Sequence, residues 1–247
     1  MDRMLYVAMS GASETLLAQS TNSHNLANSN TTGFLADLQQ FRSMPVFGDG
    51  FPTRVYAQSE RPRIDFTPGP IHATERDLDV AVKGDGWIAV QAPDGSEAYT
   101  RAGDLQIDAN GLLTTGTGLP VIGNAGPIAI PPAEKIEFAS DGTISIRPLG
   151  QGANELAVID RIKMVNPAID QLDKGEDGLI RLKDGTVADA AADTQLVGGY
   201  LEASNVNLVD QMVNMIELAR RFEMQVKMMK TAEETDAAST SLLRQQG

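Results

Sequence analysis

The strongest pattern in the sequence lies near its C-terminus, where apolar residues recur at alternating steps of four and three. This spacing is typical of a helix that buries one apolar stripe against a partner helix. The stripe comprises Leu208, Met212, Met215, Ala219, Phe222, Val226 and Met229, and Val209, Val213 and Ile216 widen it over the first turns. Because one helix cannot bury such a stripe on itself, the pattern predicts a partner.

A second stripe with the same rhythm lies at the other end of the chain. Its positions are Leu5, Met9, Ala12, Leu16, Gln19, Ser23 and Leu26. Polar residues in such a stripe lower stability but help to fix register and partner choice. An isolated helix of this kind is marginal in water, so we expect residues 2–27 to order only on packing. The C-terminal helix is the first candidate for its partner, which predicts a coiled-coil-like pair of terminal helices.

The residues that flank the two helices carry end signals. Residues 26–34 read Leu-Ala-Asn-Ser-Asn-Thr-Thr-Gly-Phe. Asn28 and Gly33 tolerate positive φ and favour a helix stop there, and Phe34 can anchor the turn. Residues 35–42 are expected to extend or restart the helix. Before the last helix, Ser204 or Asn205 is expected to act as N-cap, with Asn207 as a second possibility, and that helix is expected to run to about Leu243.

Residues 44–76 are irregular and contain five prolines and three glycines. They also include the one locally basic stretch, with Arg54, Arg61 and Arg63. This composition predicts either an extended arm or long hairpin that leaves the first helix, or a plain linker.

From Leu78 the period becomes that of strands, and turn signals such as Asn110-Gly111 separate short apolar runs. The pattern predicts an all-β body of about 120 residues, a sandwich or open barrel. The expected fold class is therefore α+β, with terminal helices around a central β domain. The expected divisions are 1–43 for the N-terminal helix, 44–76 for the arm, 77–198 for the β domain and 199–247 for the C-terminal helix.

Composition narrows the function classes. The 247 residues carry a net charge of -13, which disfavours electrostatic binding of nucleic acid or anionic lipid. There is no cysteine, so disulfides and thiol chemistry are excluded. No apolar run approaches the ~18 residues of a membrane span, and residues 1–12 lack a secretory signal pattern. We expect either a cytosolic protein or one exported by a route that needs no such signal.

Candidate chemistry is sparse. His24 and His72 are the only histidines, and neither neighbours a triad partner or a zinc-ligand set. Asp104, Asp108, Asn110 and Gly111 loosely resemble a calcium loop, but position twelve is Thr115 instead of Glu, so a hairpin turn is favoured. No phosphate-binding loop occurs. We therefore predict no catalytic, cofactor-binding or metal-binding residue. A ligand-binding or hydrolytic β domain that its helices dimerise is the alternative from another class.

Two terminal motifs carry a resemblance to a known family. Residues 26–34 match the "LANxxTxGF" signature of flagellar rod and hook proteins. Residues 199–207, Gly-Tyr-Leu-Glu-Ala-Ser-Asn-Val-Asn, resemble the second signature of that family, together with the Met212-Val213, Arg220 and Phe222-Glu223 that follow. Between them, the segments that resemble the family's shared β domain are Thr67–Gly69, Leu78–Val82, Gly84–Trp87, Tyr99–Gly103 and Asp108–Leu113.

The resemblance implies a non-catalytic structural subunit of the bacterial flagellar basal body that transmits torque. Length and the opening residues are most similar to proximal-rod members, with distal-rod members as the near alternative. Such proteins leave the cytoplasm uncleaved through the flagellar type III export apparatus. They assemble helically in the periplasm with copies of themselves and other rod proteins, without membrane insertion. Their terminal helices form the inner tube.

The expected assembly interface follows from the two stripes and the two signatures. It comprises Leu5, Met9, Ala12, Leu16, Leu26, Asn28, Gly33, Phe34, Ser204, Asn205, Leu208, Met212, Met215, Ala219, Phe222, Val226 and Met229. The arm at residues 44–66 is expected to pack on neighbouring subunits and to stiffen the tube.

Overall fold

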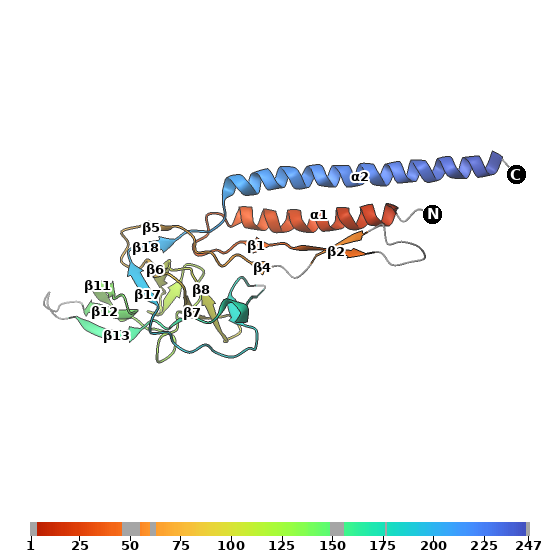
Figure 1. Ribbon diagram of the computed structural model, residues 1–247. Coiled ribbons are helices and arrows are strands. Elements are labelled where there is room, and N and C mark those ends of the chain that lie inside the picture. Colours follow the sequence, from red (N-terminus) through yellow and green to blue (C-terminus); the bar gives the residue numbers. More distant parts are fainter. Residues whose placement is uncertain (1–3, 46–54, 60–62, 149–155, 176, 246–247) are drawn as a thin grey trace. The chain divides into compact units, whose positions relative to one another are not determined.

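The computed structural model describes residues 4–45, 55–59, 63–148, 156–175 and 177–245 (Figure 1). Helices α1 (Met4–Ala27) and α2 (Leu208–Gln245) bracket a β-rich middle, so the predicted α+β class is confirmed. The chain forms two compact units. The helical unit contains residues 1–29, 36–65 and 206–247, and the β body contains residues 30–35 and 66–205.

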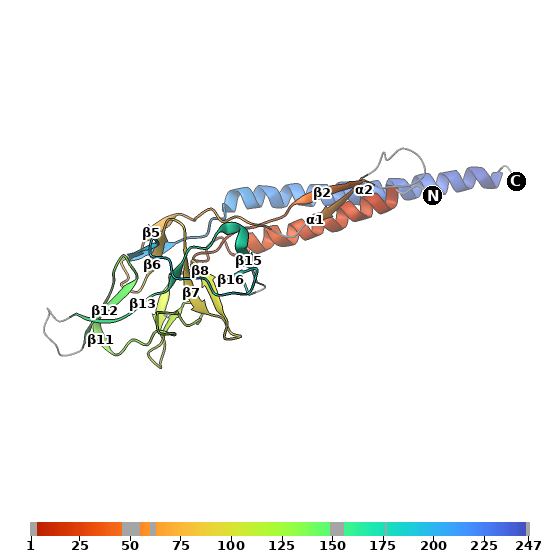
Figure 2. The same cartoon turned by 60° about the horizontal axis from the view of Figure 1, so that its bottom comes forward.

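The two helices lie side by side within the helical unit and run antiparallel (Figures 1 and 2). Asn22 Nδ2 donates a hydrogen bond of 2.9 Å to the carbonyl oxygen of Gln211. Farther along, a Cβ atom added to Gly11 would lie 2.8 Å from Gln225 Nε2. Both observations place α2 against α1 within this unit. In the part of the chain that the structure describes, neither helix is long and apolar enough to cross a bilayer.

The expectation that residues 35–42 extend the helix is wrong. This stretch instead begins β1 (Asp37–Leu38) and β2 (Phe41–Pro45). Asn25 explains the change of course, because its side chain bonds both backbone groups of Asp37. Asn25 Nδ2 donates to Asp37 O at 2.8 Å, and Asp37 N donates to Asn25 Oδ1 at 2.9 Å. These bonds hold the chain extended beside the end of α1.

Strand pairs continue this segment. β2 pairs antiparallel with β3 (Val55–Ser59), and β1 pairs with β4 (Arg63–Ile64). The Ser10 hydroxyl of α1 donates to the carbonyl of Ala57 at 3.2 Å, so β3 lies against α1. The described residues thus form a hairpin that lies along the helix. Residues 46–54 and 60–62, with Arg54 and Arg61, lie outside the described part.

The β body is built from short antiparallel strands. Its largest sheet has five strands in the order β14-β7-β8-β16-β15, and a second sheet has the order β11-β12-β13. Three two-stranded ladders, β9 with β10, β6 with β17 and β5 with β18, complete it. The bounds are β5 Ile71–Ala73, β6 Val80–Lys83, β7 Trp87–Gln91, β8 Glu97–Thr100, β9 Leu105–Ile107, β10 Leu113–Thr115, β11 Ala133–Phe138, β12 Thr143–Pro148, β13 Ala157–Arg161, β14 Met164–Val165, β15 Leu172–Lys174, β16 Ile180–Leu182, β17 Gln195–Gly198 and β18 Tyr200–Glu202; a 3-10 turn spans Ile169–Gln171.

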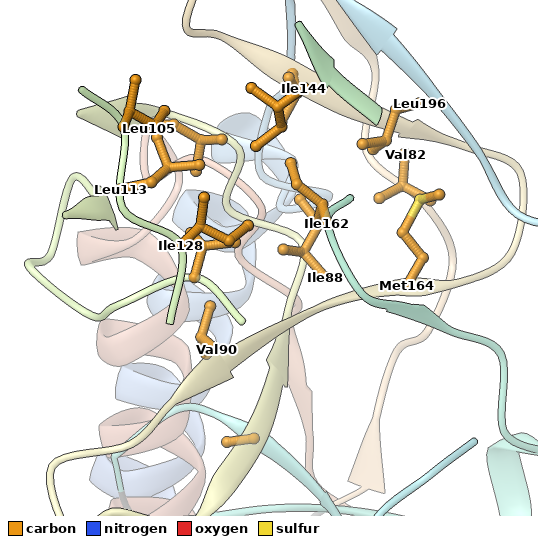
Figure 3. Close-up of a cluster of buried hydrophobic side chains, with 14 of the residues drawn as sticks. Val82, Ile88, Val90, Leu105, Leu113, Ile128, Ile144, Ile162, Met164 and Leu196 are labelled. Carbon is orange, nitrogen blue, oxygen red and sulfur yellow. The ribbon is translucent and has the colours of Figure 1, made fainter. Parts of the chain in front are cut away.

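One apolar cluster holds these strands together (Figure 3). Side chains from separate ladders meet in it, such as Val82 of β6, Ile88 of β7, Leu113 of β10 and Ile144 of β12, and each is almost completely buried. Burial of a branched aliphatic side chain stabilises a fold by about 1.5–3 kcal/mol, so this cluster accounts for the cohesion of the body.

The predicted hairpin at Asn110-Gly111 is confirmed, because β9 and β10 pair across it. Gly111 has a φ of +80°, which glycine adopts without strain. The carboxylate of Asp108 accepts hydrogen bonds of 2.8 Å from the backbone N–H groups of Asn110 and Leu112. These bonds hold the pKa of Asp108 below its usual range. The carboxylate that resembled a calcium ligand therefore serves the turn.

Candidate assembly site

Helix α2 presents one face to α1, which we name the inner stripe. It comprises Gln211, Met215, Leu218, Phe222, Gln225 and Met229, all of which are half-buried. Gln211 and Gln225 are the two positions with a direct relation to α1 described above, and they lie two heptads apart. Met215, Leu218, Phe222 and Met229 are spaced from these two glutamines by alternating steps of four and three, so they lie on the same side of the helix.

A second group of apolar residues on α2 remains exposed, and we name it the outer face. It comprises Leu208, Val209, Met212, Val213 and Ile216, whose exposed fractions run from 47% to 65%. Farther along, Met224, Val226 and Met228 are also exposed. Contiguous exposed apolar surface of this kind marks interaction sites in soluble proteins. The outer face is therefore a candidate assembly surface.

Helix α1 packs through small and polar residues. Its buried positions are Ala8, Ala12, Thr15, Ala18, Asn22 and Asn25. Small side chains let neighbouring backbones approach closely, and α1 has neighbours in both α2 and β3. Leu5, Met9 and Leu16 remain exposed. The prediction that the stripe from Leu5 to Leu26 faces α2 is therefore wrong for these three bulky members.

The predicted C-terminal stripe mixes the two faces of α2. Met215, Ala219, Phe222 and Met229 are half-buried, whereas Leu208, Met212 and Val226 are exposed. Of the remaining predicted helix positions, Ala12 is buried and Leu26 is half-buried. Three members of the inner stripe, Gln211, Leu218 and Gln225, were not predicted, and two of them are glutamines, which a pattern of apolar residues passes over.

The β2–β3 hairpin adds apolar surface that the sequence reading missed. Phe41, Met44 and Val55 are about half exposed on it. A groove of about 390 Å³ lies between this hairpin and the two helices. Its lining includes Val7, Gly11, Phe41, Val55 and Met228. The sequence signal for this hairpin was the strand propensity of residues such as Phe41 and Val55, which lie close to prolines.

Parts of the two terminal signatures, residues 33–34 and 202–205, meet in the β body. Gly33 has a φ of +65°, and its N–H donates to the carbonyl of Glu202 at 2.8 Å. The N–H of Asn205 donates to the carbonyl of Phe34 at 3.2 Å, and Ser204 is buried beside it. Residues from both ends of the sequence therefore form one bonded cluster, of which Glu202 was not predicted.

The ends of the two helices are set by asparagine side chains. Asn28 Nδ2 donates to the carbonyl of His24 at 2.9 Å, which confirms the predicted stop of α1. The cap of α2 is Asn207, whose Oδ1 accepts from Val209 N at 3.0 Å and Asp210 N at 3.4 Å. The first-choice caps, Ser204 and Asn205, are wrong, because they lie before the helix and within the cluster just described.

Other polar groups among the described residues have structural roles. The buried Tyr99 hydroxyl accepts a hydrogen bond of 2.7 Å from Ala188 N, and burial raises the pKa of Tyr99 to about 12. His24 Nδ1 lies 3.0 Å from Asp37 Oδ2. Among the described residues, no three His, Asp or Glu side chains gather as a metal site.

Comparisons with known proteins place these features in one family. Three family models match: "Flagella basal body rod protein" at residues 5–34, "Flagellar hook protein FlgE/F/G D1 domain" at 81–146 and "Flagellar basal body rod FlgEFG protein C-terminal" at 197–242. The chain is 44% identical to the flagellar basal-body rod protein FlgF of Escherichia coli K12, over 98% of this chain and 99% of the relative. It is 33% identical to FlgF of Caulobacter vibrioides over 98% of each chain. It is 32% identical to the rod protein FlgG of Bacillus subtilis, over 94% of this chain and 96% of the relative. The chain belongs to the flagellar basal-body rod protein family.

Proposed function

We propose that this chain is a structural subunit of the flagellar rod that assembles helically with copies of itself and with other rod proteins. Relatives of nearly equal length that are named rod proteins support this function over a β domain dimerised by its helices. The higher identity to FlgF, 44% against 32% for the FlgG of Bacillus subtilis, favours the proximal rod over the distal rod.

The observation that carries the assembly mechanism is the outer face of α2. Leu208, Val209, Met212, Val213 and Ile216 stay exposed although α2 already has α1 as a partner. The exposed apolar surface gains free energy only when a further molecule covers it. A contact between different surfaces of successive copies that does not close on itself generates a helical filament. The outer face is thus proposed as one side of that contact.

The predicted interface residues enter this proposal in two roles. The exposed positions Leu5, Met9 and Leu16 of α1 and Leu208, Met212 and Val226 of α2 are proposed to contact neighbouring subunits. Met215, Phe222 and the other inner-stripe residues are proposed to hold α1 and α2 as a coiled-coil-like pair. The segment at residues 44–66 is proposed to pack on neighbours and to stiffen the rod.

The remaining parts of the proposal concern place and export. The subunit is proposed to reach the periplasm through the flagellar type III export apparatus without a cleaved signal. There it transmits torque along the rod without catalysing a reaction. The division at residues 43, 76 and 198 is proposed to separate the axial helices, the arm and the β domain.

Met212→Asp tests the assembly surface. The variant places a charge in the outer face, so it is expected to be exported but absent from isolated basal bodies, and cells that carry it as the sole copy are expected to be non-motile. Asn214→Asp adds the same charge at an exposed polar position of α2 and serves as the control. Emission of Trp87, the single tryptophan, monitors folding of the β body. Normal amounts of Met212→Asp in basal bodies would contradict the proposed interface.

A further inference from the structure

A buried ion pair, Arg101 with Glu202, lies in the β body where residues of the two signatures meet. Arg101 is 3% exposed and Glu202 is 1% exposed, and Arg101 Nη1 lies 2.9 Å from Glu202 Oε2. Removal of two charges from water is costly, and apolar residues of similar volume often stabilise such a site as well or better. Net stability is therefore a weak explanation for this pair.

The side chains of the pair bond to backbone groups from separate segments. Glu202 Oε1 accepts from Gly69 N at 3.0 Å, and Arg101 Nη2 donates to Gly84 O at 2.9 Å. The guanidinium lies 5.2 Å from the centre of the Trp87 ring. The pair thus joins Arg101 and Glu202 to two further segments, one at Gly69 and one at Gly84 and Trp87, with directional contacts.

The backbone of the same two residues holds the segment that follows α1. Gly33 N donates to Glu202 O, and a Cβ added to Gly33 would lie 2.3 Å from the carbonyl carbon of Arg101. The space there admits glycine only. The turn of the first signature is therefore pressed against Arg101 and bonded to Glu202.

These contacts lie next to the points where the chain passes between the two units. The crossings fall after residues 29, 35, 65 and 205. On the β-body side, Phe34 O accepts from Asn205 N, and the ring of Phe66 packs edge-on against Trp87 with centroids 5.9 Å apart. Ala203 N donates to Pro70 O at 2.9 Å. Three of the four crossings therefore begin from residues tied to this cluster.

We propose that the Arg101–Glu202 pair is a positioning lock that holds the crossings of the chain as one block at the edge of the β body. Its consequence in the rod rests on the proposed function: helices that leave from a fixed block transmit twist to the body, whereas independently mobile crossings dissipate it. The two signatures then serve a joint within the subunit, in addition to any contact between subunits.

The test replaces both charges in the full-length chain with apolar residues of similar length, Arg101→Met with Glu202→Met. Amide hydrogen exchange is then read at Gly33, Ala203 and Asn205, whose acceptors are backbone carbonyls that the variant retains. Selective local opening is expected to raise these rates by about tenfold or more. The amides of Leu113 and Ile128, which bond within the apolar core, are expected to change by less than about threefold.

The matched control removes another partly buried ion pair of the same body. Lys163 Nζ lies 2.8 Å from Glu97 Oε1, and its replacement by Lys163→Met with Glu97→Met leaves the signatures untouched. This control is expected to leave Gly33, Ala203 and Asn205 protected. Equal protection in the lock variant and in the wild type would overturn the proposal, as would equal loss of protection in the control.

A second variant covers the case in which the double replacement unfolds the body, seen as rapid exchange at Leu113 and Ile128. Arg101→Lys keeps the charge but lacks the planar fork that reaches both Glu202 and Gly84. It is expected to raise exchange selectively at Gly33, Ala203 and Asn205, and the absence of a selective rise would refute the lock.

Incorporation into basal bodies separates this inference from the proposed function. The lock variant, with both helix faces intact, is expected to be exported but poorly incorporated. Selective opening combined with normal incorporation would refute the role of the lock in the rod. Failure of the outer-face test alone would refute the assembly surface and leave the exchange result standing.

Discussion

Two alanine substitutions on α2 separate the contact within the chain from the contact between chains. Phe222 is half-buried on the inner stripe, whereas Ile216 is 56% exposed on the outer face. Both are large apolar residues of one helix, and they lie six residues apart. Phe222→Ala is expected to weaken the pairing of α1 with α2, and Ile216→Ala is expected to weaken only association with other subunits.

The magnitudes follow from burial. Phe→Ala in a core costs about 3–5 kcal/mol, so half-burial gives roughly 2 kcal/mol for Phe222→Ala in the free chain. An exposed substitution such as Ile216→Ala changes stability by no more than about 0.5 kcal/mol. Full burial of an Ile side chain contributes about 1.5–3 kcal/mol, of which roughly half remains available at Ile216. Its loss lowers an association constant by roughly three- to tenfold, because 1.4 kcal/mol corresponds to one decade.

Hydrogen exchange and co-assembly measure the two effects separately. In the free chain, Phe222→Ala is expected to raise amide exchange in the α1 segment around Ala12 by roughly thirtyfold, and Ile216→Ala by less than about threefold. In basal bodies isolated from cells that express equal amounts of wild type and variant, the Ile216→Ala subunit is expected to be present in a smaller amount than the wild type. Val213→Ala, a neighbouring outer-face change, is expected to show the same separation between exchange and incorporation.

Two results would refute this reasoning. If Ile216→Ala opens α1 as much as Phe222→Ala does, the assignment of the two faces is wrong. If Ile216→Ala competes equally with the wild type, the outer face contributes nothing to assembly, and the exposed apolar residues need another explanation.

Two further predictions concern local stability. Burial, followed by the charge of Asp79, raises the pKa of Asp104 above its usual range. The folded chain thus favours the neutral form of the Asp104 carboxyl group. The stability that this preference contributes is fully present below the unfolded-state pKa and is lost as pH rises through the folded-state pKa. Asp104→Asn is expected to raise the free energy of unfolding at pH 7 by at most about 1 kcal/mol, since the site is partly exposed. At pH 3 the same substitution is expected to give no gain. Urea unfolding followed by Trp87 emission measures both values, and an equal gain at the two pH values would contradict this reasoning. Asn207→Ala removes the cap of α2 and is expected to cost about 1 kcal/mol in its first turn, seen as roughly fivefold faster exchange there. Asn214→Ala, in the second turn of the same helix, is expected to cost less. Equal effects of the two changes would argue against the cap.

The parts of the fold that the sequence predicted well depend on local patterns. The two helices follow from four-three spacing, and the stop of α1 follows from Asn28. The β9–β10 hairpin follows from Asn110-Gly111, whose backbone preference is intrinsic to those two residues. Each of these features is decided by residues within a few positions of one another.

Features decided by distant partners were not predicted. The packing face of α1 consists of small residues because α2 and β3 both lie close to it, and no property of Ala8 or Thr15 alone reveals those two neighbours. Residues 35–42 read as helix until Asn25 bonds the backbone of Asp37. The ion pair of Arg101 with Glu202 joins residues that no periodicity relates. A single acid inside the short apolar run of the second signature was the one visible sign of it.

The distribution of side-chain size on the helices supports the proposed assembly. On α1 the intrachain contact uses small or polar residues such as Ala8, Ala12 and Thr15. On α2 the inner stripe includes two glutamines beside its apolar members, all of them only half-buried. The larger residues Met9, Leu16 and Ile216 are left exposed. A chain with its large apolar residues between the two helices and its small residues outside would bury most of that apolar surface within one molecule. Such a chain would gain little free energy from contact with a neighbour. The observed arrangement pairs the two helices within one chain and leaves Met9, Leu16 and Ile216 exposed, which supports the proposal that further subunits cover them.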